Sequence, residues 1–342
     1  MKKNIVTIVV AFCLIIAGVA LAGAALVAVD FDFGGFSNVN YERNSYVIEG
    51  DIGKISVIAQ DHNVIILPSE NSICKIEVDE SEDFKLGYRF EDKHLVIKMT
   101  DDRKWYDHIS FFSAEADLVL YLPAGEYDRL SVETDTGDVK VSEEFSFTFV
   151  LASAGTGDIE FLAKTHKELS LSCSTGDITV RDVEPEDLRA SVSTGNIVVE
   201  NIKASDKISL SCNTGKIEVH GSEAKNIECW GSTGDILLKY VTVEAQVNVR
   251  RSTGDVTLTS VLADSFVIKT STGDVKLNLS DAEEINIETD TGRVEGSLLS
   301  EKIFKCESSS GSIKVPETHS GGVCKIKTST GNIHITVSED KK

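Results

Sequence analysis

The sequence predicts an all-β protein. The expected fold is a single-stranded β-solenoid of about 11 coils with a 19–20 residue period and an N-terminal β cap, preceded by one transmembrane helix. Three observations predict this architecture. A Thr-Gly motif recurs in register, the residues on both sides of it alternate between apolar and polar, and a long uncharged segment opens the chain.

The recurring motif is typified by the STGDI sequence at residues 174–178. Its glycines are 19 or 20 residues apart, and the residue before each glycine is Thr in every copy except Ser310. Such a fixed period is typical of stacked supersecondary units. We expect glycine at the corner because the turn requires φ > 0 or a close backbone approach. The structural corner glycines are Gly137, Gly157, Gly176, Gly195, Gly215, Gly234, Gly254, Gly273, Gly292, Gly311 and Gly331.

Both flanks of the corner glycine have the period-two alternation of a half-buried strand. The positions five and seven before it are apolar in all copies, and the position two after it is Val or Ile. Each repeat is therefore a strand, a Thr-Gly turn, a second strand and a connection. Units this small must stack, with equivalent positions ~4.8 Å apart in a parallel ladder. A β-sandwich is the main alternative, but sandwiches rarely hold one motif in register through so many turns.

The N-terminal segment is predicted to anchor the protein in a membrane. Lys2 and Lys3 precede an uncharged, largely apolar run at 5–29, which is long enough to span a bilayer, and Asp30 follows it. The positive-inside rule then places the N-terminus in the cytoplasm and residues 30–342 outside the cell membrane. The alternative is a secreted protein with a cleaved signal peptide, because residues 22–24 (AGA) resemble a cleavage site.

The domain organisation follows from these patterns. In the cap, Tyr46 and Ile48 precede Gly53, and Ile55 and Val57 follow it, at the spacing of the repeat, which predicts a degenerate first repeat with its corner at Gly53. The predicted segments are a transmembrane anchor at 1–29, a juxtamembrane linker at 30–45, an irregular N-terminal β cap at 46–128, β-solenoid repeats at 129–338 and a charged tail at 339–342.

Further strands are expected in the cap and at the far end of the rod. Strand-like stretches in the cap lie at 64–67, 74–78, 95–99 and 118–122. The last strand, 333–337, is expected to form the far edge of the rod, blunted by the charged tail.

Composition excludes some classes of function. The net charge of −21, without a Lys/Arg-rich run, disfavours nucleic-acid binding. Cys173 and Cys212 occupy one column two coils apart, and Cys306 and Cys324 are offset along neighbouring strands, so both pairs exceed the ~7 Å limit for a disulfide. We expect the cysteines to be buried free thiols that act as small apolar residues.

A column of carboxylates follows the corner glycine. Stacked carboxylates ~4.8 Å apart repel one another, and a bound Ca²⁺ would relieve the repulsion. The column is interrupted by Asn196, Lys216 and Arg293, and the alternative is a turn-forming Asp bonded to its own backbone. Apart from this calcium hypothesis, no cofactor is expected. The candidate metal ligands are Asp138, Asp158, Asp177, Asp235, Asp255 and Asp274.

A basic aromatic patch is the candidate ligand-binding site. Trp230 occupies a column, four residues before the corner glycine, that is polar in the other coils and is expected to face solvent. Arg250 and Lys269 follow it in that column, and Arg251 is adjacent. Such a patch can stack on a sugar ring or hold an anionic glycan. The alternative is an intramolecular cation–π contact between Trp230 and Arg250.

No catalytic residues are expected. The seven histidines are scattered without metal-ligand spacing, and the acidic residues follow the repeat instead of forming one local pair. A polysaccharide-active β-helix enzyme is retained as a further alternative, because some such enzymes place acids on one exposed sheet.

The sequence of residues 118–141, LVLYLPAGEYDRLSVETDTGDVKV, with the repeated STGDI and STGNI corners, resembles the bacterial putative-adhesin family of β-strand repeats, a domain of unknown function. The resemblance covers residues 46–338. It implies a β-solenoid protein of the cell envelope, in a family sometimes linked to envelope-stress responses, and it brings no catalytic residues. We therefore expect a non-catalytic adhesin or envelope interaction protein whose partner is a cell-wall glycan or an envelope protein. The alternative is an envelope-stress sensor or scaffold acting on a membrane or secreted partner. The sequence does not predict an oligomeric state.

Overall fold

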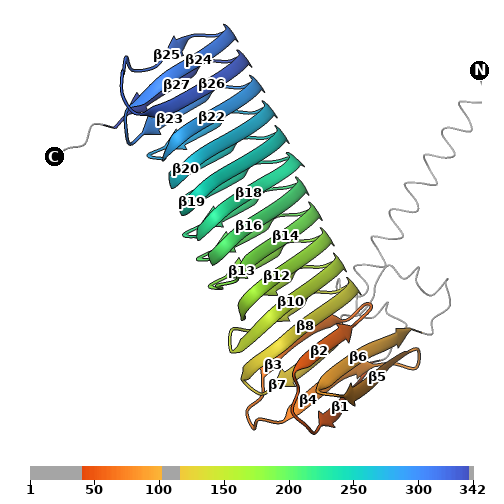
Figure 1. The fold of residues 1–342 in the computed structure, drawn as a ribbon. Coiled ribbons are helices and arrows are strands. Elements are labelled where there is room, and N and C mark those ends of the chain that lie inside the picture. Colours follow the sequence, from red (N-terminus) through yellow and green to blue (C-terminus); the bar gives the residue numbers. More distant parts are fainter. Residues whose placement is uncertain (1–40, 102–115, 339–342) are drawn as a thin grey trace, which may run out of the picture.

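A computed structural model describes residues 41–101 and 116–338 of the chain. These residues form β-strands and turns, stacked into a long rod with an irregular N-terminal end (Figure 1). The β-solenoid predicted from the repeats is therefore confirmed. No helix able to cross a membrane occurs within the described ranges, and the predicted span at 5–29 lies outside them.

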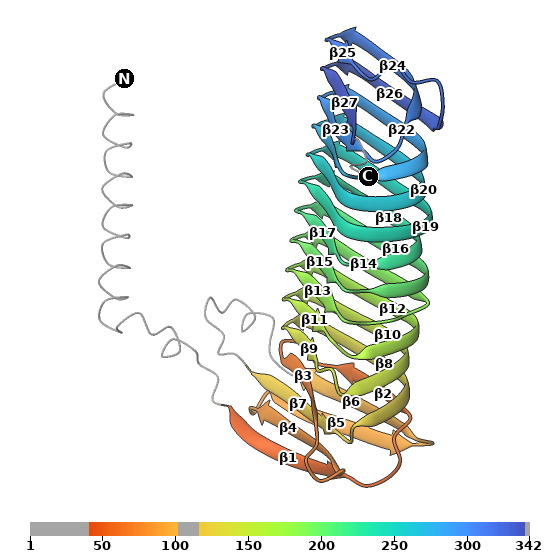
Figure 2. The same ribbon diagram turned by 90° about the vertical axis from the view of Figure 1, so that its left-hand side faces the viewer.

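Each coil contributes one long and one short strand to two parallel ladders, which form opposite faces of the rod (Figure 2). The strands β19 (Ile236–Thr253) and β20 (Val256–Thr272) run through both ladders. The long ladder also contains β8 (Gly125–Thr136), β10 (Phe145–Thr156), β12 (Lys164–Thr175), β14 (Asp187–Thr194), β16 (Lys203–Thr214), β18 (Glu223–Thr233), β22 (Asp281–Thr291), β24 (Lys302–Ser310) and β26 (Gly322–Thr330). The short ladder also contains β9 (Val139–Val141), β11 (Ile159–Phe161), β13 (Ile178–Arg181), β15 (Ile197–Glu200), β17 (Ile217–His220), β21 (Val275–Asn278), β23 (Val294–Leu298), β25 (Ile313–Lys314) and β27 (Ile333–Val337).

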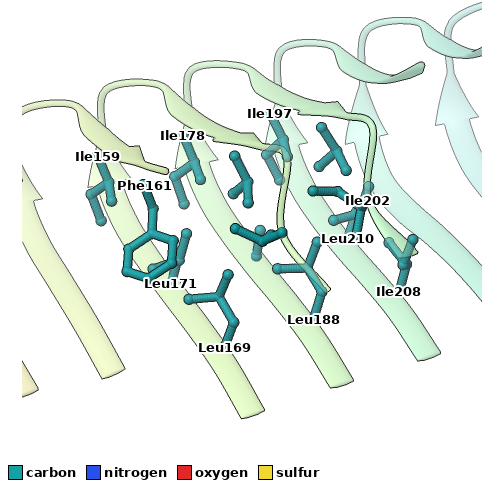
Figure 3. Close-up of a cluster of buried hydrophobic side chains, with 14 of the residues drawn as sticks. Ile159, Phe161, Leu169, Leu171, Ile178, Leu188, Ile197, Ile202, Ile208 and Leu210 are labelled. Carbon is teal, nitrogen blue, oxygen red and sulfur yellow. The ribbon is translucent and has the colours of Figure 1, made fainter. Parts of the chain in front are cut away.

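The core fills the space between the two ladders. Apolar side chains of the short strands, at the positions two and four after the glycine, face those of the long strands, at the positions five and seven before it. In the coil of Gly176, for example, Ile178 on the short strand faces Leu169 and Leu171 on the long strand (Figure 3). All three side chains are almost completely buried. Because each fully buried Leu or Ile contributes roughly 1.5–3 kcal/mol, the alternating pattern read from the sequence is the main source of stability.

The corner leaves no room for a side chain. Gly195 has a φ of +139°, and a Cβ atom built on it would lie 2.0 Å from the carbonyl oxygen of Gly176 in the preceding coil. Glycine is required here by both conformation and space.

Side chains inside the corner satisfy several of the glycine carbonyls. Cys173 Sγ donates to the carbonyl of Gly157 at 3.0 Å, and Thr328 Oγ1 donates to that of Gly292 at 3.1 Å. Each donor lies three residues before the glycine of its own coil. The expectation that cysteines serve only as small apolar residues is therefore incomplete, because some of the thiols also act as hydrogen-bond donors.

The cysteines in the described part of the chain are free thiols. Cys173 and Cys212 both pair with Val192, one on each side, so they lie two coils apart as predicted. Burial raises the pKa of Cys229 and of Cys324 to about 12. These thiols stay protonated at neutral pH and are not activated nucleophiles.

The N-terminal cap consists of two further coils and three antiparallel strands. The strands β2 (Lys54–Ile58) and β6 (His94–Asp101) extend the long ladder below β8, while β3 (Asn63–Pro68) and β7 (Asp117–Leu122) extend the short ladder below β9. The antiparallel strand β5 (Phe84–Glu91) closes the long ladder. The antiparallel strands β4 (Cys74–Glu80) and β1 (Glu42–Ile48) close the short ladder.

The predicted corner at Gly53 is wrong. Tyr46 and Ile48 belong to β1, which is antiparallel to β4 and outside the repeat. Ile55 and Val57 instead pair with Leu130 and Val132, seven and five residues before Gly137, so His62 takes the glycine's place in this coil. The sequence hid this coil because its corner contains neither Thr nor Gly. The strands expected at 64–67, 74–78, 95–99 and 118–122 correspond to β3, β4, β6 and β7.

The predicted order of the last two coils is also wrong. β26 lies between β22 and β24, and β27 lies between β23 and β25, so the final coil inserts before the preceding one. The physical reason is apolar content. The final coil places Ile326 and Ile335 at inward positions where the outer coil has the smaller Cys306 and Val315, so placing the final coil inside buries the larger apolar side chains.

We predict that Gly195→Ala strongly destabilises the rod. A methyl group at 2.0 Å from a backbone oxygen forces the neighbouring coils apart, and the positive φ adds strain, so we expect a loss of at least about 2 kcal/mol. Urea unfolding followed by circular dichroism measures the loss. Gly125→Ala is the matched control, because a Cβ there has nothing within 4 Å. Equal stability of the two variants would contradict the corner argument.

A second prediction concerns acid stability of the cap. Arg43 donates two hydrogen bonds of 2.8 Å to the carboxylate of Asp79, which lowers the pKa of Asp79. A lowered folded-state pKa gives stability that is complete above the unfolded value of about 3.9 and is lost as pH falls through the folded pKa. We expect Asp79→Asn to cost about 1 kcal/mol at pH 7 and to reduce the further loss on acidification.

Urea midpoints measured from pH 7 to pH 2 test this expectation. The exposed Asp83→Asn is the control, and it should leave both the midpoint and its acid dependence unchanged. A wild-type pH profile retained by Asp79→Asn would show that another group controls the acid transition.

Candidate functional site

Trp230 lies on the outer face of the long ladder, as its column predicts. It belongs to β18, pairs with Ser211 on one side and Arg250 on the other, and is 39% exposed. The alternation of the strand explains its position, because the neighbouring Cys229 points into the core and is buried. An indole ring therefore stands in an outward column that is polar in the other coils.

The surface around Trp230 is hollowed. The hollow has a volume of about 770 Å³ and spans several consecutive coils of the long ladder. It brings together all four residues of the predicted patch, with Arg251 beneath the others. The residues that line it are Asn213, Glu228, Cys229, Trp230, Gly231, Ser232, Asn248, Arg250, Arg251, Ser252, Lys269, Thr270, Ser271, Glu288 and Asp290.

Arg250 is exposed, and within the described part of the chain its guanidinium has neither an ion pair nor a hydrogen bond. The alternative of a cation–π contact between Trp230 and Arg250 is not realised. The contacts of this kind among the described residues are those of Lys75 with Tyr121, Arg129 with Phe149 and Lys239 with Tyr240. Both the indole face and the guanidinium of this pair are therefore available to a ligand.

The other charged groups of the hollow are mostly paired. Lys269 Nζ lies 3.0 Å from Glu288 Oε2, and this hydrogen-bonded ion pair lowers the pKa of Glu288. Glu228 is paired with Lys207 at 2.7 Å. Lys269 therefore acts in the hollow as half of an ion pair rather than as a free cation.

These carboxylates do not resemble the acid and base of a glycosidase. Glu228 and Glu288 lie three coils apart, roughly 14 Å at ~4.8 Å per coil, which is wider than the ~5–9.5 Å that glycoside hydrolysis requires. Glu288 and Asp290 are closer, but the lowered pKa of Glu288 rules it out as the general acid, and Asp290 is exposed to solvent instead of lying in the apolar surroundings typical of such an acid. The geometry gives the enzyme alternative no support.

Arg251 has a structural environment that the sequence did not reveal. Only 4% of it is exposed, and its guanidinium donates to the carbonyls of Cys212 at 2.7 Å, Thr233 at 2.8 Å and Gly215. Its Nε donates to Gly234 at 2.6 Å. With these donors occupied, Arg251 supports the floor of the hollow and is not a free ligand-binding group.

Gly231 makes the arrangement of Arg251 possible. A Cβ atom at Gly231 would lie 2.1 Å from Arg251 Nη1 and 1.7 Å from the carbonyl oxygen of Cys212. The space left free by the absence of a side chain at Gly231 is thus filled by the side chain of Arg251 in the next coil. The signal was present in the sequence, since Gly and Arg occupy consecutive places in a column of small residues three before the corner glycine.

Further lining residues were missed because single columns were considered in isolation. Asn213, Ser232, Ser252, Ser271 and Asp290 occupy the column two before the glycine, and Glu228 and Asn248 occupy the column six before it. Both columns flank that of Trp230 on the same face. Listing all three outward columns around the tryptophan would have identified these groups.

The aspartate column has a structural role that neither prediction included. Asp158 Oδ1 accepts from the backbone N–H of Asp177 at 2.7 Å, and Asp177 Oδ1 accepts from that of Asn196 at 2.7 Å. Each carboxylate therefore bonds the equivalent residue of the next coil and not its own turn. The same pattern joins Asp138 to Asp158, Asp235 to Asp255, and Asp255 to Asp274.

Basic residues end the two runs of this ladder. The backbone N–H of Lys216 donates to Asn196 Oδ1, but the lysine side chain offers no acceptor to the next coil. The backbone N–H of Arg293 donates to Asp274 Oδ1, and its guanidinium also forms an ion pair of 2.7 Å with Asp274. No group of three or more potential metal ligands occurs in the described ranges. One oxygen of each of these carboxylates accepts a backbone hydrogen bond. Calcium binding by the column stays a prediction.

Comparisons with known proteins place the chain in a family. The family model described as Toastrack DUF4097 matches residues 52–250 and 233–342, which together are most of the chain. No curated protein is significantly similar to it.

Solved structures that match the chain come from bacteria. A putative adhesin from Parabacteroides merdae is 14% identical with a TM-score of 0.38, and the match covers 88% of this chain and 98% of that one. A putative lipid binding protein from Parabacteroides distasonis is 16% identical with a TM-score of 0.42, covering 73% and 97%. A putative cell adhesion protein from Clostridium sporogenes is 11% identical with a TM-score of 0.21, covering 87% and 100%. Similarities this weak transfer no function.

We predict that Asp177→Ala destabilises the rod by about 1–2 kcal/mol, because it leaves the N–H of Asn196 without its acceptor. Asp177→Asn should be nearly neutral, since Asn196 performs the same role for Lys216 at 3.0 Å. Urea unfolding compares the variants, with the exposed Asp206→Ala as the control. Calcium that stabilises the wild type but not Asp177→Asn would instead support the predicted metal site.

Proposed function

Since the chain belongs to the Toastrack DUF4097 family, we propose that it is a non-catalytic interaction protein of the cell envelope that binds a glycan in the hollow around Trp230. The observation that carries the proposal is an exposed tryptophan beside an arginine that has no partner among residues 41–101 and 116–338. A pyranose ring stacks its C–H face on the indole, and the surrounding polar groups bond its hydroxyls.

The charges favour a glycan with acidic substituents. Arg250 is the cation in the hollow without a described partner, whereas Lys269 is held by Glu288. A planar guanidinium binds a carboxylate or phosphate through two parallel hydrogen bonds. The rest of the rod is strongly acidic, with a net charge of −21 for the chain, and so repels an anionic polymer except at this place.

The proposed topology brings the hollow to the cell exterior. The apolar run at 5–29 anchors the chain as a single span with its N-terminus in the cytoplasm, and residues 30–342 extend outside. A cleaved signal peptide would give the same exposure of the hollow without the anchor. Glycan binding is thus compatible with both topologies, and an N-terminal peptide identified by mass spectrometry of the mature protein distinguishes them.

We predict that Trp230→Ala reduces glycan binding about fivefold or more, because a stacked aromatic contributes about 1 kcal/mol or more. An array of cell-wall polysaccharides and acidic and neutral glycans, probed with the full-length chain in detergent, measures this loss. Arg250→Ala should weaken acidic glycans selectively. Tyr240→Ala is the matched control, since Tyr240 is 62% exposed but outside the hollow.

The same array distinguishes the alternatives. Calcium-dependent binding would direct attention to the aspartate column. Glycan binding that persists in Trp230→Ala would place the site elsewhere on the rod. A chain that binds no glycan would overturn the proposal and favour a scaffold or stress sensor, whose protein partner crosslinking in intact membranes would then identify.

A further inference from the structure

The C-terminal end of the rod is built unlike its N-terminal end. At the N-terminal end, the outermost strands are β1 and β5, which run antiparallel to the strand beneath them and also pair on one side only. At the other end, β24 and β25 are the outermost strands, and each pairs with only one neighbour (Figures 1 and 2). Within the described ranges, no strand covers this end.

The outer coil leaves backbone donors unused. In the coils below it, Gly292 N and Gly331 N donate to the next coil, as do Val294 N and Ile333 N. The equivalent groups of the outer coil, Gly311 N and Ile313 N, make no such bond in the described part of the chain. An edge with free donors and acceptors is a template for another strand.

The same end exposes the core. Ile313 is 42% exposed, although it occupies the inward position two residues after Gly311, where Val294 and Ile333 of the coils below are fully buried. Phe304, Cys306 and Val315 pack against the core but are only partly buried. A partner that adds another coil to both ladders would bury this apolar surface and satisfy the free backbone groups together.

We propose that a second copy of this chain covers the end, with β24 of one copy antiparallel to β24 of the other around a twofold axis at Cys306. A twofold interface is self-complementary, so the strand must match its own reversed sequence. The outward side chains near its centre are Lys305 and Glu307. Centred on Cys306, Lys305 of each copy faces Glu307 of the other, which gives two pairs of opposite charge.

The neighbouring registers are disfavoured. Shifting the axis to residue 305 places Lys305 opposite Lys305, and shifting it to 307 places Glu307 opposite Glu307. Like charges directly opposite each other are destabilising. Placing the twofold axis between two residues of β24 would set inward side chains of one copy opposite outward side chains of the other, which the alternation of a strand does not allow. The register at Cys306 keeps Phe304 and Cys306 facing inward on both copies, so the two cores become continuous.

An end-to-end dimer would connect two membranes if each chain is anchored as proposed above. Two rods that meet at their C-terminal ends point their N-terminal ends in opposite directions. Anchored chains joined in this way connect two facing membranes. The end-to-end contact itself requires neither the anchor nor a glycan, so its failure would not affect the hollow around Trp230.

Charge reversal tests the contact. Lys305→Glu or Glu307→Lys alone converts both opposite pairs into like pairs, and we expect the dimer dissociation constant to rise about tenfold. The double variant Lys305→Glu/Glu307→Lys restores both pairs and should restore the dimer. Sedimentation of the full-length chain in detergent over a range of concentrations measures the constants, and thermal unfolding confirms that each variant is folded.

Cross-linking reports on the register independently. Paired residues on antiparallel strands have Cα atoms about 4.5–5.5 Å apart, within the ~4.4–6.8 Å range of a disulfide. Mild oxidation should therefore yield a disulfide-linked dimer through Cys306, and Cys306→Ser should abolish it while leaving sedimentation unchanged. A wild type that is monomeric at all concentrations overturns the proposal, as does a dimer that is insensitive to both charge reversals or that cross-links through another cysteine.

Discussion

The close approach of consecutive coils at the glycine corner is the constraint on which the rest of this structure depends. At Gly195 and Gly215 a Cβ atom would lie 2.0 Å and 1.9 Å from a carbonyl oxygen of the preceding coil. The ladder hydrogen bonds on both sides of the corner keep their length only because this contact is so short. With one fixed corner per coil, every other position of the repeat becomes a column, and each column has one environment along the rod.

This regularity explains why so much of the fold followed from the sequence. The corner glycines, the inward positions represented by Ile178 and Leu171, and the outward position of Trp230 are all set by distance from the nearest glycine. What a linear pattern does not contain is the stacking order. The coils around Gly311 and Gly331 both carry the repeat spacing, and the pairing of β26 with both β22 and β24 shows that the second lies inside the first. The cap coil at His62 could not be predicted for a related reason. Its corner lacks the Thr-Gly motif, and only the pairing of β2 with β8 identifies it as a coil.

The candidate site arises where the columns are broken. Three successive coils carry Trp230 with Gly231, then Arg250 with Arg251, then Lys269 with Thr270, in columns that elsewhere hold small or ordinary polar residues. The exposed tryptophan was predictable from its column. The role of Arg251 was not, because its side chain reaches back over the empty place at Gly231 to carbonyls of two earlier coils. The column of a residue in the sequence indicates which way its side chain points within its own coil, but not whether a long side chain reaches into another coil.

The two breaks in regularity, at the hollow and at the end, call for different kinds of partner. The hollow interrupts the outer face of a ladder, where the backbone is already fully paired, so recognition there depends on side chains and suits a small, ring-shaped ligand. The C-terminal end interrupts the ladder itself, so recognition there depends on backbone pairing and suits another strand. A repeat protein that ends in an unclosed coil is prone to open-ended association. A twofold contact limits the association through this end to a pair, because it joins the same strand of two copies and leaves no equivalent strand free for a third.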